Sequence, residues 1–232
     1  MKKRFLAALL AMVLLWLLPG CGGGKDTAAV SPSPTVTFKP EDIAYSEKMG
    51  MELDPETKQD KYHTDPVPEG KPLPVNPEDV DAYGEEELHC TLSISCAVIL
   101  DHMDELDEKK HKLVPADGWI LEPTEVVFFE GENVFNVLQR ECRQRGIHME
   151  FSGGNIYGSA YIEGINNLYE FDLPGYSGWM YAVNDWFPNY GCERYALKDG
   201  DVVEWKYTSD CGYDIGGGYA TGGVYDKEGD QP

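Results

Sequence analysis

The fold is decided by the stretch Val126-Val127-Phe128-Phe129-Glu130-Gly131-Glu132-Asn133-Val134-Phe135-Asn136-Val137-Leu138. Its first four residues form a short apolar run, which is typical of a strand covered on both faces. From Val134 the apolar residues recur at helical spacing as far as Cys142. Asn133 is a suitable N-cap, and Gly146 is a suitable C-terminal stop. The stretch therefore predicts a strand that leads directly into an amphipathic helix.

Further strands are predicted on both sides of this helix. Before it, alternating apolar residues from Leu92 to Val98 are typical of a half-buried strand. After it, strand-like runs occupy residues 148–151, 159–163, 179–183 and 201–208. One helix among several strands predicts an α+β fold, in which a β-grasp-like mixed sheet carries one packed helix.

The N-terminal residues have the features of an export signal. A basic start precedes the apolar run from Phe5 to Leu18, whose about 14 residues are fewer than the roughly 20 that a membrane span needs. Leu18-Pro19-Gly20-Cys21 is similar to the lipobox of bacterial lipoproteins. We therefore expect residues 1–20 to be a lipoprotein signal peptide, with lipid on Cys21 and the chain on the extracytoplasmic face of the cell membrane. The alternative is an ordinary cleaved signal followed by an incidental cysteine.

Composition divides the remaining chain into three parts. Residues 21–82 are rich in proline and charge, which predicts a disordered stalk. Residues 83–212 carry nearly all the periodic apolar pattern and form the expected folded domain. Residues 213–232 form a Gly-rich polar tail.

Charge and motifs exclude several functions. The formal net charge of −22 repels phosphate groups, which argues against nucleic-acid binding, and it repels anionic lipid headgroups, so membrane contact should come from the lipid anchor alone. The five histidines lack the spacing of metal ligands. The helix lacks a phosphate-binding loop before it, and no serine lies in a nucleophile elbow. The sequence therefore predicts no enzyme, no metal site and no resident cofactor.

Two blocks of sequence resemble a known family. Residues 127–138, and residues 178–184 followed by 197–207, are similar to the transcobalamin-like C-terminal domain, a domain of unknown function common in lipoproteins of Gram-positive bacteria. The resemblance covers about residues 90–212. It implies a β-grasp fold, and it implies a ligand edge formed by Trp179 and Tyr181, with Trp186, Phe187 and Tyr190 on the following loop.

The resemblance also implies a ligand class. In transcobalamin and intrinsic factor, the corresponding domain closes over cobalamin held against a separate helical barrel. This chain has no room for such a barrel, so a corrinoid could meet only half of a binding site. Asn184-Asp185 also stands where the family often has Asn-Gly, which puts the length of that hairpin tip in doubt.

The aromatic residues of loop 186–191 leave two functions open. They either fold back onto the sheet or form an exposed patch. A concave patch would favour a surface-anchored lipoprotein that presents a non-catalytic binding module for a small ligand such as a corrinoid. A flat or convex patch would favour a protein–protein interaction or scaffold domain without a small-molecule ligand.

Five cysteines remain after Cys21, and an odd number leaves at least one outside any intramolecular disulfide. Cys90 and Cys96 are too far apart in an extended strand to pair. Cys192 with Cys211 is the pair that the predicted loop and last strand favour. Cys142 lies on the apolar face of the helix, where we expect burial.

Overall fold

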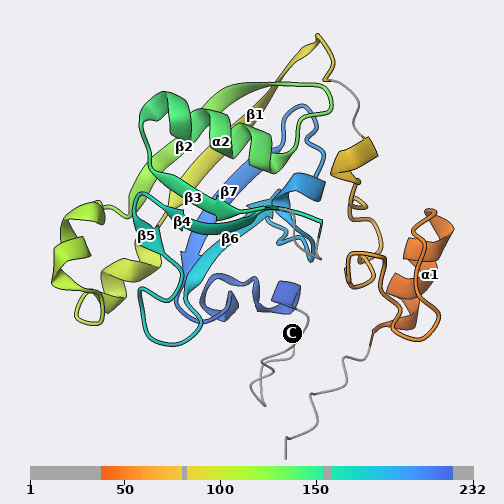
Figure 1. Cartoon of the computed structure of the whole chain (residues 1–232), viewed down its shortest axis with the longest axis horizontal. Coiled ribbons are helices and arrows are strands. Elements are labelled where there is room, and N and C mark those ends of the chain that lie inside the picture. The colour runs from red at the N-terminus through yellow and green to blue at the C-terminus, as the bar shows by residue number, and fades with distance from the viewer. Residues whose placement is uncertain (1–37, 80–82, 154–157, 222–232) are drawn as a thin grey trace, which may run out of the picture. The chain divides into compact units, whose positions relative to one another are not determined.

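The computed structural model describes residues 38–79, 83–153 and 158–221 (Figure 1). The chain divides into two compact units, residues 1–33 and 34–232, and only the second contains described residues. The predicted signal peptide and lipidation site Cys21 therefore lie outside the described part, as do residues 222–232 of the predicted tail.

A four-stranded mixed sheet forms the centre of the fold, with the strand order β2-β1-β7-β6. Strand β1 (Glu87–Ser95) pairs antiparallel with β2 (Trp119–Phe129) and parallel with β7 (Val202–Thr208). Strand β6 (Gly178–Val183) pairs antiparallel with β7. The predicted α+β class with a mixed sheet is confirmed.

Helix α2 (Val134–Arg145) packs across this sheet, as predicted (Figure 1). A capping box fixes its start, because Asn133 Oδ1 accepts from the Asn136 amide at 2.9 Å and Asn136 Oδ1 accepts from the Asn133 amide at 3.0 Å. Gly146 ends the helix in the left-handed conformation, with φ of 67°.

The two strands predicted directly after the helix, at residues 148–151 and 159–163, form a second sheet instead of joining the first. Strands β3 (Met149–Ser152), β4 (Tyr161–Ile165) and β5 (Leu168–Tyr169) pair antiparallel in that order. Asn166 and Asn167, with φ of 54° and 59°, make the tight turn between β4 and β5. Gly164 is required beside this turn, because a Cβ there would lie 2.8 Å from the Tyr169 ring.

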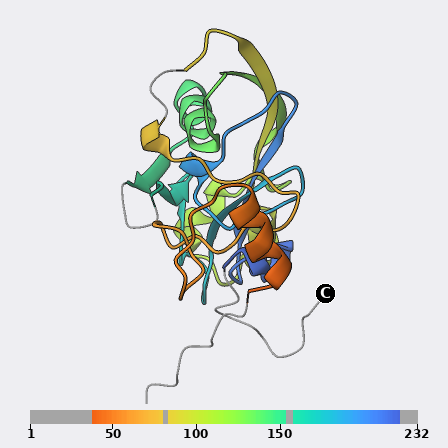
Figure 2. The same cartoon turned by 90° about the vertical axis from the view of Figure 1, so that its right-hand side faces the viewer.

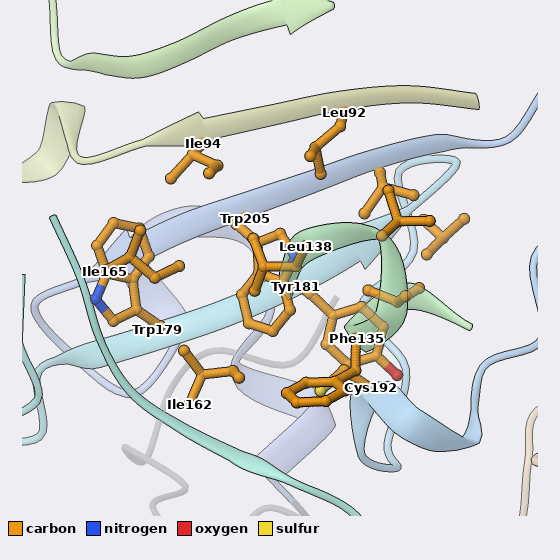
Figure 3. Packing of buried hydrophobic residues seen from close by; sticks show 14 of the residues in the cluster. Leu92, Ile94, Phe135, Leu138, Ile162, Ile165, Trp179, Tyr181, Cys192 and Trp205 are labelled. Atoms are coloured by element: carbon orange, nitrogen blue, oxygen red, sulfur yellow. The ribbon is translucent and has the colours of Figure 1, made fainter. Parts of the chain in front are cut away.

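One hydrophobic core joins the helix and both sheets. Figure 3 shows Leu138 of α2 lying over Trp205 of β7, with Tyr181 beside them and Ile162 of β4 close by. The rings of Tyr181 and Trp205 have centroids 5.5 Å apart. Trp205 is only 2% exposed, so it is a central core residue, as its alternation predicted.

The prediction of a disordered stalk over residues 21–82 is wrong for residues 38–79. Helix α1 (Pro40–Lys48) and the chain after it cross in front of the domain in Figure 2, and Tyr45 of α1 packs against the hydrophobic core. Val67 is fully buried in the hydrophobic core, and the Val67 amide donates to the buried Ser46 hydroxyl at 2.9 Å. Composition failed here because the surface that orders these residues belongs to the domain and not to the segment itself.

Short 3₁₀ helices complete the described chain: η1 (Pro77–Asp79), η2 (Ala97–His102), η3 (Glu108–Leu113), η4 (Cys192–Arg194), η5 (Tyr213–Ile215) and η6 (Gly218–Thr221). The strand predicted to reach Val98 ends at Ser95, where η2 follows. Residues 213–221 of the predicted polar tail fold back, because the Asp214 carboxylate accepts from the Ser209 amide at 2.7 Å.

Candidate functional site

The aromatic loop leaves β6 through a tight turn. Asn184 and Asp185 have φ of 51° and 60°, and Val183 and Trp186 exchange backbone hydrogen bonds of 2.8 and 3.1 Å. This is a two-residue hairpin turn that asparagine and aspartate tolerate. The Asn184 side chain also donates to Asp201 Oδ1 at 2.8 Å. The departure from Asn-Gly therefore does not lengthen the hairpin tip.

Trp179 and Tyr181, predicted at a ligand edge, lie in the core and are each 8% exposed. The Trp179 indole N–H donates to the Leu168 carbonyl, and the Tyr181 hydroxyl donates to the Tyr190 carbonyl, both at 2.8 Å. Burial raises the pKa of Tyr181 well above its usual value. Both polar groups are thus used inside the domain.

Trp186, Phe187 and Tyr190 fold back onto the sheet and are only 4–7% exposed. The Tyr190 ring stacks on Tyr195 with centroids 6.2 Å apart, and Trp186 meets Tyr190 edge-on at 5.9 Å. The structure therefore favours the first of the two sequence alternatives, a folded-back aromatic loop. Ligand binding by the five aromatic residues stays a prediction.

Residues 63–76, which we call the proline segment, cover the aromatic loop. The Tyr190 hydroxyl donates to the Pro72 carbonyl at 2.8 Å. The Asn189 side-chain amide donates to the carbonyls of Asp65 at 3.0 Å and Pro66 at 3.2 Å. The loop that was predicted to be a ligand site thus already contacts another part of the same chain.

Arg194 contacts several parts of the N-terminal segment at once, and it was not predicted from the sequence. Its side chain is 2% exposed and its Nη2 lies 2.7 Å from Asp60 Oδ2. It also donates to the Thr64 hydroxyl and, through Nε, to the Val75 carbonyl at 3.2 Å, while its guanidinium carbon lies 4.5 Å from the centre of the Tyr62 ring. No local pattern could reveal it, since these partners lie more than a hundred residues earlier.

A hollow of about 240 Å³ lies where the aromatic loop meets residues 62–64 and the short helix η6. It is lined by Tyr62, His63, Thr64, Pro188, Asn189, Tyr190, Gly191 and Ala220. Of the five predicted ligand residues, Tyr190 lines this hollow. The hollow is bordered by amide, hydroxyl, imidazole and ring groups, with no lysine, arginine or carboxylate in its lining.

The predicted disulfide between Cys192 and Cys211 is not formed. Cys192 is 3% exposed, and its thiol donates to the Ala160 carbonyl at 3.6 Å, whereas the Cys211 amide donates to the Tyr176 carbonyl at 3.0 Å. The loop and the strand end are therefore held by different partners. Cys142 is buried as predicted, and burial raises the pKa of its thiol to about 12.

Within residues 38–79, 83–153 and 158–221, no group of three or more histidine, cysteine or acidic side chains could hold a metal ion. The helices in this part of the chain include none that is both long and apolar enough to cross a bilayer.

Comparison with known proteins gives one match to a family. The profile of a domain of unknown function, DUF4430, matches residues 131–209, which include α2, the aromatic loop and β7. No curated protein matches the sequence.

Two solved structures show weak likeness. One is haptocorrin in complex with Cbi, at 13% identity and a TM-score of 0.37 over 53% of this chain, which spans a quarter of that protein. The other is a protein of Ruminococcus gnavus provisionally described as metal-binding, at 17% identity and a TM-score of 0.32, over 52% of this chain and 96% of that one.

Proposed function

We propose that this chain is a lipoprotein, anchored through Cys21 on the extracytoplasmic face of the cell membrane, that presents a non-catalytic binding module. Its site is the hollow beside the aromatic loop. The lipobox and the similarity of residues 131–209 to a family of unknown function agree with this proposal, as does the resemblance to transcobalamin-like domains.

The observation that carries the proposal is the composition of the hollow. Three separate segments meet there, and they contribute two phenols, an imidazole, an amide and a hydroxyl around a solvent-open space. A few convergent polar groups beside aromatic rings are typical of sites for small ligands.

The size of the hollow argues against a corrinoid as a tightly held ligand. Sites for drug-sized ligands usually measure roughly 300–1,000 Å³ and bury most of the ligand. The present hollow, at about 240 Å³, can enclose only an edge of a corrin ring. Calorimetry with cyanocobalamin should therefore give a dissociation constant no better than about 10 µM, since the entropy lost on association is offset by few contacts. Sub-micromolar binding would contradict this reasoning.

A thermal-shift screen of the chain from residue 22 tests the proposal, with corrinoids, glycans, amino acids and metal salts as probes. A specific ligand raises the melting temperature by mass action. Ala220→Leu, which places extra atoms in the hollow, should abolish that shift. The matched control is Ala116→Leu, at an exposed position of the turn before β2, which should preserve it. A shift that survives Ala220→Leu would place the ligand elsewhere.

A scaffold domain is the second candidate. Its supporting observation is a set of exposed aromatic residues that do not line the hollow, with Phe171 63%, Tyr176 52% and Tyr161 47% exposed. Phe171 also has a positive φ of 61°, an unusual conformation for an aromatic residue. If no probe changes the melting temperature, protein binding through these residues becomes the leading function.

A further inference from the structure

The proline segment contains the same short unit twice. Pro66-Val67-Pro68 and Pro72-Leu73-Pro74 are separated by a turn in which the Lys71 amide donates to the Pro68 carbonyl at 3.1 Å, and Gly70 supplies the required φ of 83°. Each proline fixes its own φ and favours extended backbone at the residue before it. The segment is therefore two stiff, extended Pro-x-Pro units folded back by one turn.

The aromatic loop holds the two units in the same way. The carbonyl of the first proline in each unit accepts a side-chain hydrogen bond, Pro66 from Asn189 at 3.2 Å and Pro72 from Tyr190 at 2.8 Å. Two adjacent loop residues thus recognise equivalent atoms of the two units.

The middle residue of each unit is apolar and points to the core. Val67 is fully buried, and Leu73 is half-buried against the same cluster. Lys71, in the turn between the units, has its ammonium 5.4 Å from the centre of the Trp186 ring. Apolar contacts at the middle positions and polar contacts at the carbonyls together define a sequence preference.

Arg194 holds both ends of the segment. At the first end its side chain donates to the Thr64 hydroxyl. At the other end its Nε donates to the Val75 carbonyl, and the Val75 amide donates to the Arg194 carbonyl at 2.9 Å. The side-chain hydrogen bonds of Asn189, Tyr190 and Arg194 to the segment all run from loop donors to segment acceptors. Proline lacks an amide N–H and keeps its carbonyl, so a surface of donors beside aromatic rings is chemically matched to proline-rich chain.

We propose that residues 186–194 form a recognition surface for an extended peptide with two Pro-x-Pro units and apolar middle residues, which the chain's own proline segment occupies in the structure. This inference deepens the proposed binding module by naming a peptide class for the aromatic loop, and it depends neither on the lipid anchor nor on a ligand in the hollow. A surface that recognises the proline carbonyls and the apolar middle residues binds such a peptide without a covalent connection to it, because stiff prolines lose little entropy on docking.

The test uses the whole chain from residue 22, with a specific protease sequence in place of residues 80–82. After cleavage, the two fragments should co-elute in gel filtration, and a labelled synthetic peptide of residues 58–79 should exchange into the complex, as measured by fluorescence anisotropy. Tyr190→Phe removes one hydrogen bond and should weaken peptide binding about 3- to 10-fold. Tyr161→Phe, whose hydroxyl bonds Glu170 outside this surface, is the matched control and should leave peptide affinity unchanged.

A peptide with Val67→Asp should fail to exchange, since a carboxylate would replace a fully buried side chain. The inference is overturned if the fragments separate while the domain keeps its circular dichroism, or if Val67→Asp peptide exchanges as well as the natural one. It is also overturned if the domain unfolds when the fragments part, because the segment would then be ordinary core. None of these results bears on the thermal-shift screen for small ligands, so the two proposals fail separately.

Discussion

Replacing Arg194 by methionine should destabilise the protein by about 3–5 kcal/mol, the usual effect of removing one partner from a buried ion pair. The Arg194 side chain is 2% exposed, and the Asp60 side chain that pairs with it is 9% exposed. Methionine keeps most of the apolar volume of the arginine side chain. The loss of unfolding free energy therefore comes mainly from the Asp60 carboxylate, which is left without its cation. Urea titration followed by tryptophan fluorescence measures the free energy of unfolding.

Lys61→Met provides a control within the same part of the chain. Lys61 pairs with Glu78 at 2.9 Å, but the two side chains are 61% and 51% exposed. Solvent screens such a pair, so its removal should leave the free energy of unfolding nearly unchanged. Equal losses of unfolding free energy in Arg194→Met and Lys61→Met would refute the conclusion that the buried ion pair of Arg194 stabilises the protein.

A double variant separates the ion pair from the other contacts of Arg194. Asp60→Asn keeps an oxygen that can accept from the Tyr62 and Thr64 amides, each now 2.9 Å from Asp60 Oδ1. Combined with Arg194→Met it removes both charges, so the double variant should lose about 1–3 kcal/mol less than the sum of the single variants. Strict additivity would mean that the two side chains do not interact in solution.

Three further predictions follow from burial and from the sequence. Trp186→Ala and Trp205→Ala, at 5% and 2% exposure, should each lose about 3–5 kcal/mol in urea titration; a much smaller loss for Trp186 would show that its cover is open in solution. Burial raises the thiol pKa of Cys142 and Cys192 to about 12. Unfolded thiols ionise near about 8.5, so the free energy of unfolding should fall as the pH rises above that value, and mass spectrometry should find both thiols unalkylated by iodoacetamide until the chain unfolds. Cys21→Ala should release the chain from membranes in cell fractionation, and retention after signal cleavage would place the anchor elsewhere.

The central part of the fold could be predicted because its signals are local. Asn133 and Gly146 mark the ends of α2 through their own side-chain and backbone chemistry, and the period of apolar residues between them marks its buried face. The alternation around Trp205 likewise placed β7 and its core face. The grouping of β3 to β5 into a separate sheet depends on pairing between strands, for which alternation gives no signal.

The candidate site could be predicted only in part, because its geometry depends on contacts between distant residues. The aromatic loop could be located from its own residues, but no local pattern pairs Tyr190 with Pro72 or Arg194 with Asp60, which are separated by 118 and 134 residues. The same limitation led to the expected disulfide of Cys192 with Cys211. The predicted topology brought the loop with Cys192 close to the end of the last strand. It could not show which side chains of the two segments face each other.

The proline segment shows why a disorder prediction from composition can fail in a folded protein. Composition tests whether a segment can order itself by burying its own apolar side chains, and residues 63–76 have few of these. Here the aromatic surface is supplied by Trp186 and Tyr190, and without a cover those rings would be exposed, a state that soluble monomers usually avoid. The stiffness of the prolines lowers the entropy lost on docking. The segment is therefore ordered by the loop, and the loop is buried by the segment, so neither half of this contact can be predicted from its own residues.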